Sequence, residues 1–149
     1  MNLAKYIDHT ILKSDVTSQQ IVQLCKEAQE NNFYAVCVNS SYVALCFHEL
    51  KSSPVKIASV VGFPLGVCDT ATKAFETALA VKNGATEIDM VIHVGALKEK
   101  KYDYVQNDIA EVVKAAARNK VKIILKTALQ TKKKKKMACE LSLKAKAHF

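Results

Sequence analysis

The chain alternates between two patterns of apolar positions. Some segments carry apolar residues three or four positions apart, which is typical of helices that bury one face. Others are short, nearly continuous apolar runs, which are typical of buried strands. The predicted strands are 34–39, 56–63, 85–95 and 120–129. The predicted helices begin after Thr17, cover 41–50, extend from 69 or 70 to Gly84, and cover 102–119 and 132–146.

Three of the predicted helices have a clear apolar face that should pack against the strands. The first of them begins with a capping box, because Thr17 is followed three positions later by Gln20. The apolar faces carry Ile21, Leu24, Cys25 and Ala28 in the first helix, Ala74, Phe75, Ala78 and Leu79 in the third, and Val105, Ile109, Val112, Val113 and Ala116 in the fourth.

Strands and helices alternate along the chain, and no segment between them carries the turn residues of a tight hairpin. This order favours an α/β fold with parallel strands joined by right-handed helical crossovers. No linker or internal repeat divides the 149 residues, so a single domain over 1–149 is expected.

The strand 85–95 contains polar residues where a buried strand should be apolar. Side chains alternate along a strand, so Glu87, Asp89 and His93 share one face while Ile88 and Ile92 share the other. In the strand 120–129, Lys122 lies on the mixed face in the same way. A buried and unpaired carboxylate costs several kcal/mol, so an aspartate and a lysine on neighbouring strands are expected to neutralise each other.

Two interpretations of this pair remain open on the pattern alone. Asp89 and Lys122 could form a buried structural ion pair and nothing more. They could instead form a site for carbonyl chemistry, with a carboxylate that transfers protons and an amine whose pKa is lowered by a nearby cation.

Composition narrows the class of protein. Half of the residues are apolar and 24% are charged, which is typical of a globular chain. Asp8 and His9 fall where a signal peptide would have its apolar run, and no segment has the roughly 18 apolar residues of a membrane span. The five cysteines lack the spacing of a zinc site, so reduced thiols and a cytoplasmic location are expected.

The net charge of +8 is concentrated at the end of the chain. Residues 132–149, the predicted basic C-terminal helix, carry seven lysines and one glutamate, which leaves a net charge of only +2 for the rest. A polyanion-binding protein is therefore an alternative hypothesis. The tail has almost no aromatic residues for stacking on bases, so nucleic acid is not the expected partner.

Six dispersed motifs resemble one known family. They are YIDHTILKSDVT (6–17), VCVN (36–39), GFPLG (62–66), KAFE (73–76), NGATEIDMVIHVGALK (83–98) and ACELS (138–142). In this order and spacing they resemble deoxyribose-phosphate aldolase. The resemblance implies a parallel (β/α) barrel of TIM type, of which the chain supplies the first four to five strand–helix units. It also implies cleavage of 2-deoxy-D-ribose 5-phosphate to acetaldehyde and D-glyceraldehyde 3-phosphate through a lysine Schiff base, without cofactor or metal.

The resemblance also assigns site residues by position. Asp89 matches the family aspartate that transfers protons through water, and Lys122 matches a lysine near the substrate. Asp8, Thr10 and Cys37 match residues that line the pocket, although a turn cap for Asp8 and a core thiol for Cys37 remain alternatives. His93 is expected to be a satisfied side chain at a strand end.

No residue of this chain matches the Schiff-base lysine, which in the family lies on the next strand. A barrel of this type takes about 250 residues, so the expected barrel is incomplete. Lys122 could form the imine itself only if Lys126 lowered its pKa. An incomplete parallel sheet has two unpaired edges, so a remnant that needs a partner is a further alternative, and homo-oligomers or aggregation are expected.

Overall fold

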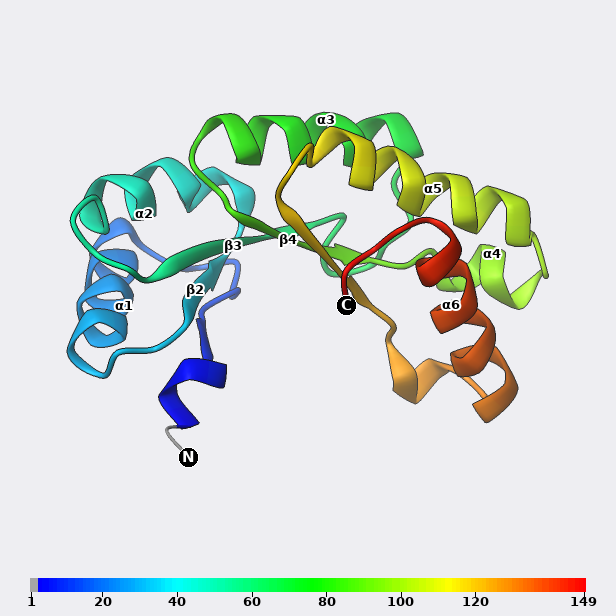
Figure 1. Cartoon of the computed structure of the whole chain (residues 1–149), viewed down its shortest axis with the longest axis horizontal. Helices are drawn as coiled ribbons and strands as arrows, with labels where there is room; N and C mark the ends of the chain where they lie inside the picture. Colours follow the sequence, from blue (N-terminus) through cyan, green and yellow to red (C-terminus); the bar gives the residue numbers. More distant parts are fainter. Residues whose placement is uncertain (1–2) are drawn as a thin grey trace.

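The computed structural model describes residues 3–149, which form one parallel sheet of five strands. The strands pair in the order in which they occur in the chain: β1 (Asp8–Thr10), β2 (Ala35–Val38), β3 (Lys56–Val61), β4 (Glu87–Val91) and β5 (Lys120–Ile124). All four neighbouring pairs are parallel. The sheet is curved, and the helices lie along its outer side (Figure 1).

Helices connect successive strands as the alternating pattern predicts. They are α1 (Ser18–Glu30), α2 (Val43–Glu49), α3 (Thr70–Lys82), α4 (Val94–Lys98), α5 (Tyr102–Ala115) and α6 (Lys132–Lys144), with 3-10 turns at Leu3–Tyr6, Ser40–Tyr42 and Thr127–Leu129. The apolar faces of α1 and α5 pack on the outer face of the sheet and form the main core with side chains such as Ile88 and Met90 of β4. Among residues 3–149, no helix is long and apolar enough to span a membrane.

The predicted capping box is confirmed. The side chain of Thr17 accepts a hydrogen bond from the backbone of Gln20, and the side chain of Gln20 accepts one from the backbone of Thr17 (2.8 Å). A comparable cap begins α6, where the Thr131 hydroxyl oxygen accepts a hydrogen bond from the backbone of Lys134. This cap supports a helix whose first turn is otherwise unfavourable, because its lysines oppose the positive end of the helix dipole.

The pattern missed two short elements. β1 is only three residues long and polar, so it has no apolar run and takes its strand geometry from pairing with β2. α4 follows β4 directly, and its N-terminus is capped by His93, whose Nδ1 accepts a hydrogen bond from the backbone of Ala96 (3.2 Å). His93 is thus the satisfied strand-end side chain that the sequence predicted.

The prediction that α3 buries the face with Phe75 and Leu79 was wrong. Phe75 is 70% exposed and Leu79 is 44% exposed, whereas Lys73, Thr77 and Ala80 are buried. The helix therefore turns a largely polar face toward the protein and its larger apolar side chains toward solvent. The reason is a polar network beneath α3, in which Lys73 is the central group.

Lys73 forms an ion pair with Asp108 of α5 that is completely buried. Its Nζ lies 2.5 Å from Asp108 Oδ2 and 3.3 Å from the backbone oxygen of Val91, and both charged side chains are 0% exposed. Asp108 Oδ1 accepts a further hydrogen bond from the Thr70 hydroxyl (2.9 Å). Every charge in this network has a partner. The free-energy cost of burying the polar face of α3 is therefore lower than it would be for unpaired charges.

The end of the chain lies against the outer edge of β5. The backbone of Phe149 accepts a hydrogen bond from Ile123 (3.0 Å) and donates one to Val121 (3.2 Å). The Nδ1 atom of His148 accepts the N–H of Val121 (3.1 Å). The last residues thus begin to pair with β5 as a sixth parallel strand would.

Candidate active site

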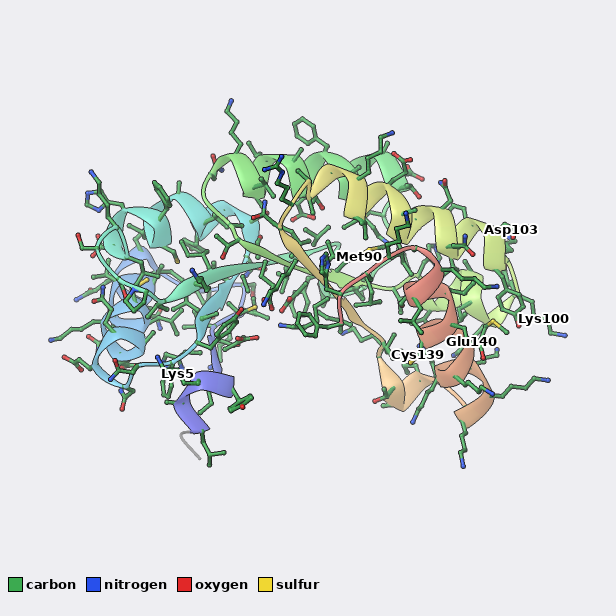
Figure 2. All side chains as sticks on the ribbon, in the orientation of Figure 1. Lys5, Met90, Lys100, Asp103, Cys139 and Glu140 are labelled. Atoms are coloured by element: carbon green, nitrogen blue, oxygen red, sulfur yellow. The ribbon has the colours of Figure 1, made fainter. Side chains whose placement is uncertain are left out.

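The polar side chains of the strands gather on the inner face of the sheet, opposite the helices. Neighbouring residues in register point to the same side, and Asp89 of β4 is paired directly with Lys122 of β5. Asp8 of β1 and Cys37 of β2 lie on the same face. Met90, labelled near the centre of Figure 2, is the next residue of β4 and belongs to the core on the opposite face.

Lys122 is the centre of an acidic cluster formed by Asp8, Glu87 and Asp89. Its Nζ lies 2.8 Å from Asp8 Oδ2, 2.6 Å from Glu87 Oε1 and 3.2 Å from Asp89 Oδ1. Three strands thereby hold one ammonium group between three carboxylates. The predicted neutralisation of Asp89 by Lys122 is confirmed.

Asp89 is buried, and one of its oxygens lacks a hydrogen bond. Lys122 donates to Oδ2 at 3.3 Å, and the Cys37 thiol also approaches Oδ2, at 3.7 Å. The 3.2 Å distance from Lys122 to Oδ1 is within ion-pair range, but Oδ1 has no hydrogen-bond donor among the described residues. Burial raises the pKa of the Asp89 carboxyl, and the attraction of Lys122 offsets this only in part. The neighbouring charges of Glu87 and Asp8 add to the rise.

The alternative in which Lys122 has a lowered pKa disagrees with the structure. Burial alone would lower the pKa of Lys122, but hydrogen bonds to Asp8 and Glu87 and the charge of Asp89 outweigh it and raise the pKa. Lys126 is not among the groups that shift this pKa, and its Nζ lies over the ring of Phe63, 5.4 Å from the ring centre. An ammonium held by three carboxylates does not become the free amine that imine formation requires.

Cys37 belongs to the site by position but not as a nucleophile. It packs in a small apolar cluster on the inner face with Ala58 and Val60. Burial and the negative charge of Asp89 raise the pKa of the Cys37 thiol to about 12, so the thiol is protonated near neutral pH.

For two residues, Thr10 and Glu87, the structure differs from the site that the sequence predicted. Thr10 shares the inner face, but its hydroxyl donates to the backbone oxygen of Asp8 (2.8 Å) and contacts no charged group of the cluster. Glu87 was not among the predicted site residues, although it makes the shortest contact with Lys122 and is only 3% exposed. Its position two residues before Asp89 was the signal that could have identified it.

The loop at the end of β3 is fixed by a side chain of α3. Glu76 accepts hydrogen bonds from the backbone of Gly62 (2.9 Å) and from the hydroxyl of Ser40 (2.8 Å). Gly62 has a φ of +63°, and a Cβ there would lie 3.1 Å from the buried Cε of Lys73. The polar face of α3 therefore holds the carboxyl-terminal ends of β2 and β3, next to the mouth of the sheet where parallel barrels carry their active sites.

The same cluster is the group of carboxylates best placed to hold a cation. One oxygen from each of Asp8, Glu87 and Asp89 lies within 4.8 Å of the others. The ammonium of Lys122 occupies this space and contacts all three residues. The arrangement is therefore suited to holding protons and an ammonium, with Asp89 as a carboxyl whose pKa burial raises.

Comparison with known proteins agrees with this geometry. A family model described as DeoC/LacD family aldolase matches residues 2–148. The chain is 54% identical over 149 residues to a deoxyribose-phosphate aldolase of Bdellovibrio bacteriovorus and 54% identical over 150 residues to one of Clostridium novyi. Its structure superposes on a putative deoxyribose-phosphate aldolase from Coccidioides immitis with a TM-score of 0.97 and 39% identity, covering 98% of this chain.

These relatives are longer than this chain. The chain spans 68% of the Bdellovibrio bacteriovorus and Clostridium novyi proteins and 58% of the Coccidioides immitis chain. Its five strands correspond to part of the TIM-type barrel of the structural relatives, as the sequence predicted. Because the family model extends over nearly the whole sequence, the chain belongs to the DeoC/LacD family of aldolases.

Proposed function

We propose that this chain supplies the proton-transfer side of a deoxyribose-phosphate aldolase site. The observation that carries the proposal is the inner-face cluster in which Asp89, with its raised pKa, lies beside the ammonium of Lys122. A carboxyl that can accept and return a proton is what carbinolamine and carbon–carbon bond steps need. The identity of 54% to named deoxyribose-phosphate aldolases supports 2-deoxy-D-ribose 5-phosphate as the substrate.

In this proposal the residues have different tasks. Asp89 accepts and returns protons, through water where the substrate does not reach it. Lys122 does not attack the substrate; it holds Asp8, Glu87 and Asp89 in place and balances part of their charge. Asp8 and Cys37 line the pocket, and Thr10 lies farther from the reacting groups. The Schiff-base lysine belongs to the strand that follows in the family, and no described lysine replaces it.

The test uses a chimera and the chain by itself. Residues 1–149 are joined to the remaining part of the Bdellovibrio bacteriovorus relative, and acetaldehyde release from deoxyribose 5-phosphate is followed with alcohol dehydrogenase and NADH. We expect the chimera to cleave the substrate. We expect the 149-residue chain to form no imine, so that its mass stays unchanged after treatment with substrate and borohydride.

Two outcomes would contradict the proposal. An inactive but folded chimera would show that residues 1–149 do not furnish a competent half of the site. A borohydride-stable adduct on Lys122 of the chain alone would show that its amine is free, against the ion pairs of the cluster.

We also propose that the protein self-associates and works in the cytoplasm. One structural relative, from Aeropyrum pernix, is described as tetrameric, with a TM-score of 0.90 and 29% identity. The exposed Phe75 and Leu79 of α3 supply apolar surface for such contacts. All five cysteines are free thiols, which supports a reducing compartment.

A further inference from the structure

Lysines from two separate segments, 98–103 and 132–140, meet on one surface of the protein. The start of α6 packs beside the end of α4, where the Lys134 ammonium donates a hydrogen bond to the backbone oxygen of Lys98 (3.2 Å). Figure 1 shows both helices at the same end of the molecule, and Lys100 is labelled there in Figure 2. The lysines of this basic surface are Lys98, Lys100, Lys101, Lys132, Lys133, Lys134, Lys135 and Lys136. The surface therefore extends beyond the lysine run of the tail.

Most of the positive charge on the basic surface has no carboxylate to balance it. Its two segments carry eight lysines and three acidic residues, which gives a net charge of +5. Glu99 pairs with Lys101 at 2.6 Å, and Glu140 lies 3.9 Å from Lys136. Asp103 is exposed at the start of α5, far from the inner face of the sheet (Figure 2). Among residues 3–149, the other six lysines have no carboxylate within 4.0 Å.

The lysines are placed unfavourably for α6 itself. The first five residues of the helix are all lysines, and their charges oppose the positive end of the helix dipole. Lys132 and Lys136 are also like charges four positions apart, which repel each other on a helix. The lysines therefore do not serve the stability of α6, and an anion bound beside them would relieve the repulsion.

We propose that the basic surface binds the phosphate backbone of double-stranded nucleic acid without reading its sequence. A duplex carries one negative charge per about 1.7 Å of its axis, so several phosphates can face lysines of both segments at once. The scarcity of aromatic residues in the tail argues against base stacking, but phosphate contacts need only cations and hydrogen-bond donors. The inference goes beyond the proposed aldolase function and does not depend on it, because no residue of the acidic cluster takes part.

An anionic membrane fits the basic surface less well than a duplex does. A helix that lies on a membrane buries its apolar face in the lipid. The apolar side chains of α6, among them Ala138 and Leu141, are instead buried against the protein. Leu143 is 74% exposed, but it lies about two turns beyond the last lysine of the run. The surface thus offers charge without an apolar face for insertion.

The test measures binding of the chain to a fluorescently labelled duplex of about 20 base pairs by fluorescence anisotropy, in about 50 to 200 mM NaCl. We expect a dissociation constant of about 10⁻⁴–10⁻⁶ M that is the same for duplexes of different sequence. Each neutralised phosphate contributes about −0.9 to the slope of log K against log salt concentration. Contacts by about four lysines therefore predict a slope of about −4 and a loss of affinity of about 10²-fold over this range.

Two matched triple variants locate the binding surface. One carries Lys132→Gln, Lys133→Gln and Lys135→Gln, and it should bind at least about tenfold more weakly at low salt, with a slope reduced by about two to three. The control loses the same charge at the opposite end of the strands, and it should bind within about twofold of the unaltered chain. Its substitutions are at exposed lysines that precede or begin β3 or end α3: Lys51→Gln, Lys56→Gln and Lys82→Gln.

Three results would overturn the proposal. An equal loss in both triple variants would show that overall charge, and not the basic surface, holds the duplex. A slope near zero would exclude phosphate contacts, and tighter binding to vesicles of phosphatidylcholine and phosphatidylserine would make a membrane the partner. The first triple variant removes charges that oppose the helix dipole, so its thermal midpoint should not fall. If it fails to fold, the salt slope of the unaltered chain and the control still decide. Cleavage by the chimera is measured separately and does not depend on this outcome.

Discussion

In the chimera, Asp89→Asn is expected to lower the turnover number by about 10²–10⁴-fold, the usual contribution of a positioned general acid or base. The substitution keeps the size of the side chain and its place beside Lys122, but asparagine cannot accept and return a proton. The change should appear in the turnover number rather than in substrate affinity. Acetaldehyde release at saturating substrate gives the measurement.

The pH dependence of the same chimera adds a second observation. Burial raises the pKa of Asp89, so the ionised form that accepts a proton should develop at a higher pH than for an ordinary aspartate. The acidic limb of the rate profile should lie correspondingly higher and disappear in the Asp89→Asn variant. Asp103→Asn is the control and should leave both turnover and profile unchanged. A drop of less than threefold for Asp89→Asn would contradict its assigned role.

Lys73→Met is expected to destabilise the chain by about 3–5 kcal/mol, because it leaves Asp108 buried without its cation. The Asp108 side chain is 0% exposed, and among residues 3–149 only the hydroxyl of Thr70 would remain as its partner. The free energy of unfolding, obtained from urea denaturation, measures the effect. Lys82→Met, on the exposed part of the same helix, is the matched control and should change stability by less than about 0.5 kcal/mol.

A double variant separates charge from packing in this network. Lys73→Met combined with Asp108→Leu removes both charges, so no unpaired ion remains in the core. Replacing a buried ion pair with apolar groups of similar volume is often close to neutral, and we expect the double variant to be more stable than Lys73→Met alone. A loss equal to the sum of the two single losses would show that the ion pair is not the reason for the polar face of α3.

The central pair of the site could be predicted because strand geometry is local. The side-chain alternation within 85–95 and 120–129 put Asp89 and Lys122 on mixed faces, and the register of β4 with β5 then places them side by side. The same alternation puts Glu87 on the face of β4 that carries Asp89. Asp8 could not be placed in this way, since β1 is a strand only through its pairing with β2.

The orientation of α3 could not be predicted from its own residues. Its apolar positions suggested one buried face, but the helix buries Lys73, whose partner Asp108 lies 35 positions later in the chain. The raised pKa of Lys122 could likewise not be predicted from the sequence. The pattern suggested a nearby cation, whereas the fold brings three carboxylates to the same amine. Contacts between distant segments decided both cases.

The central claim is that Asp89 points inward as a buried carboxyl whose proton affinity is limited by Lys122. The direct measurement is the pKa of Asp89, from the ¹³C carboxyl signal of the labelled chain, with and without Lys122→Met. We predict a value above that of an ordinary aspartate in the unaltered chain and a further rise in the variant, because the attraction of Lys122 is lost. Stability of the variant should accordingly fall as pH increases above about 4, since the folded state then holds protons that the unfolded chain releases. An ordinary pKa for Asp89 that stays the same in the variant would contradict the account.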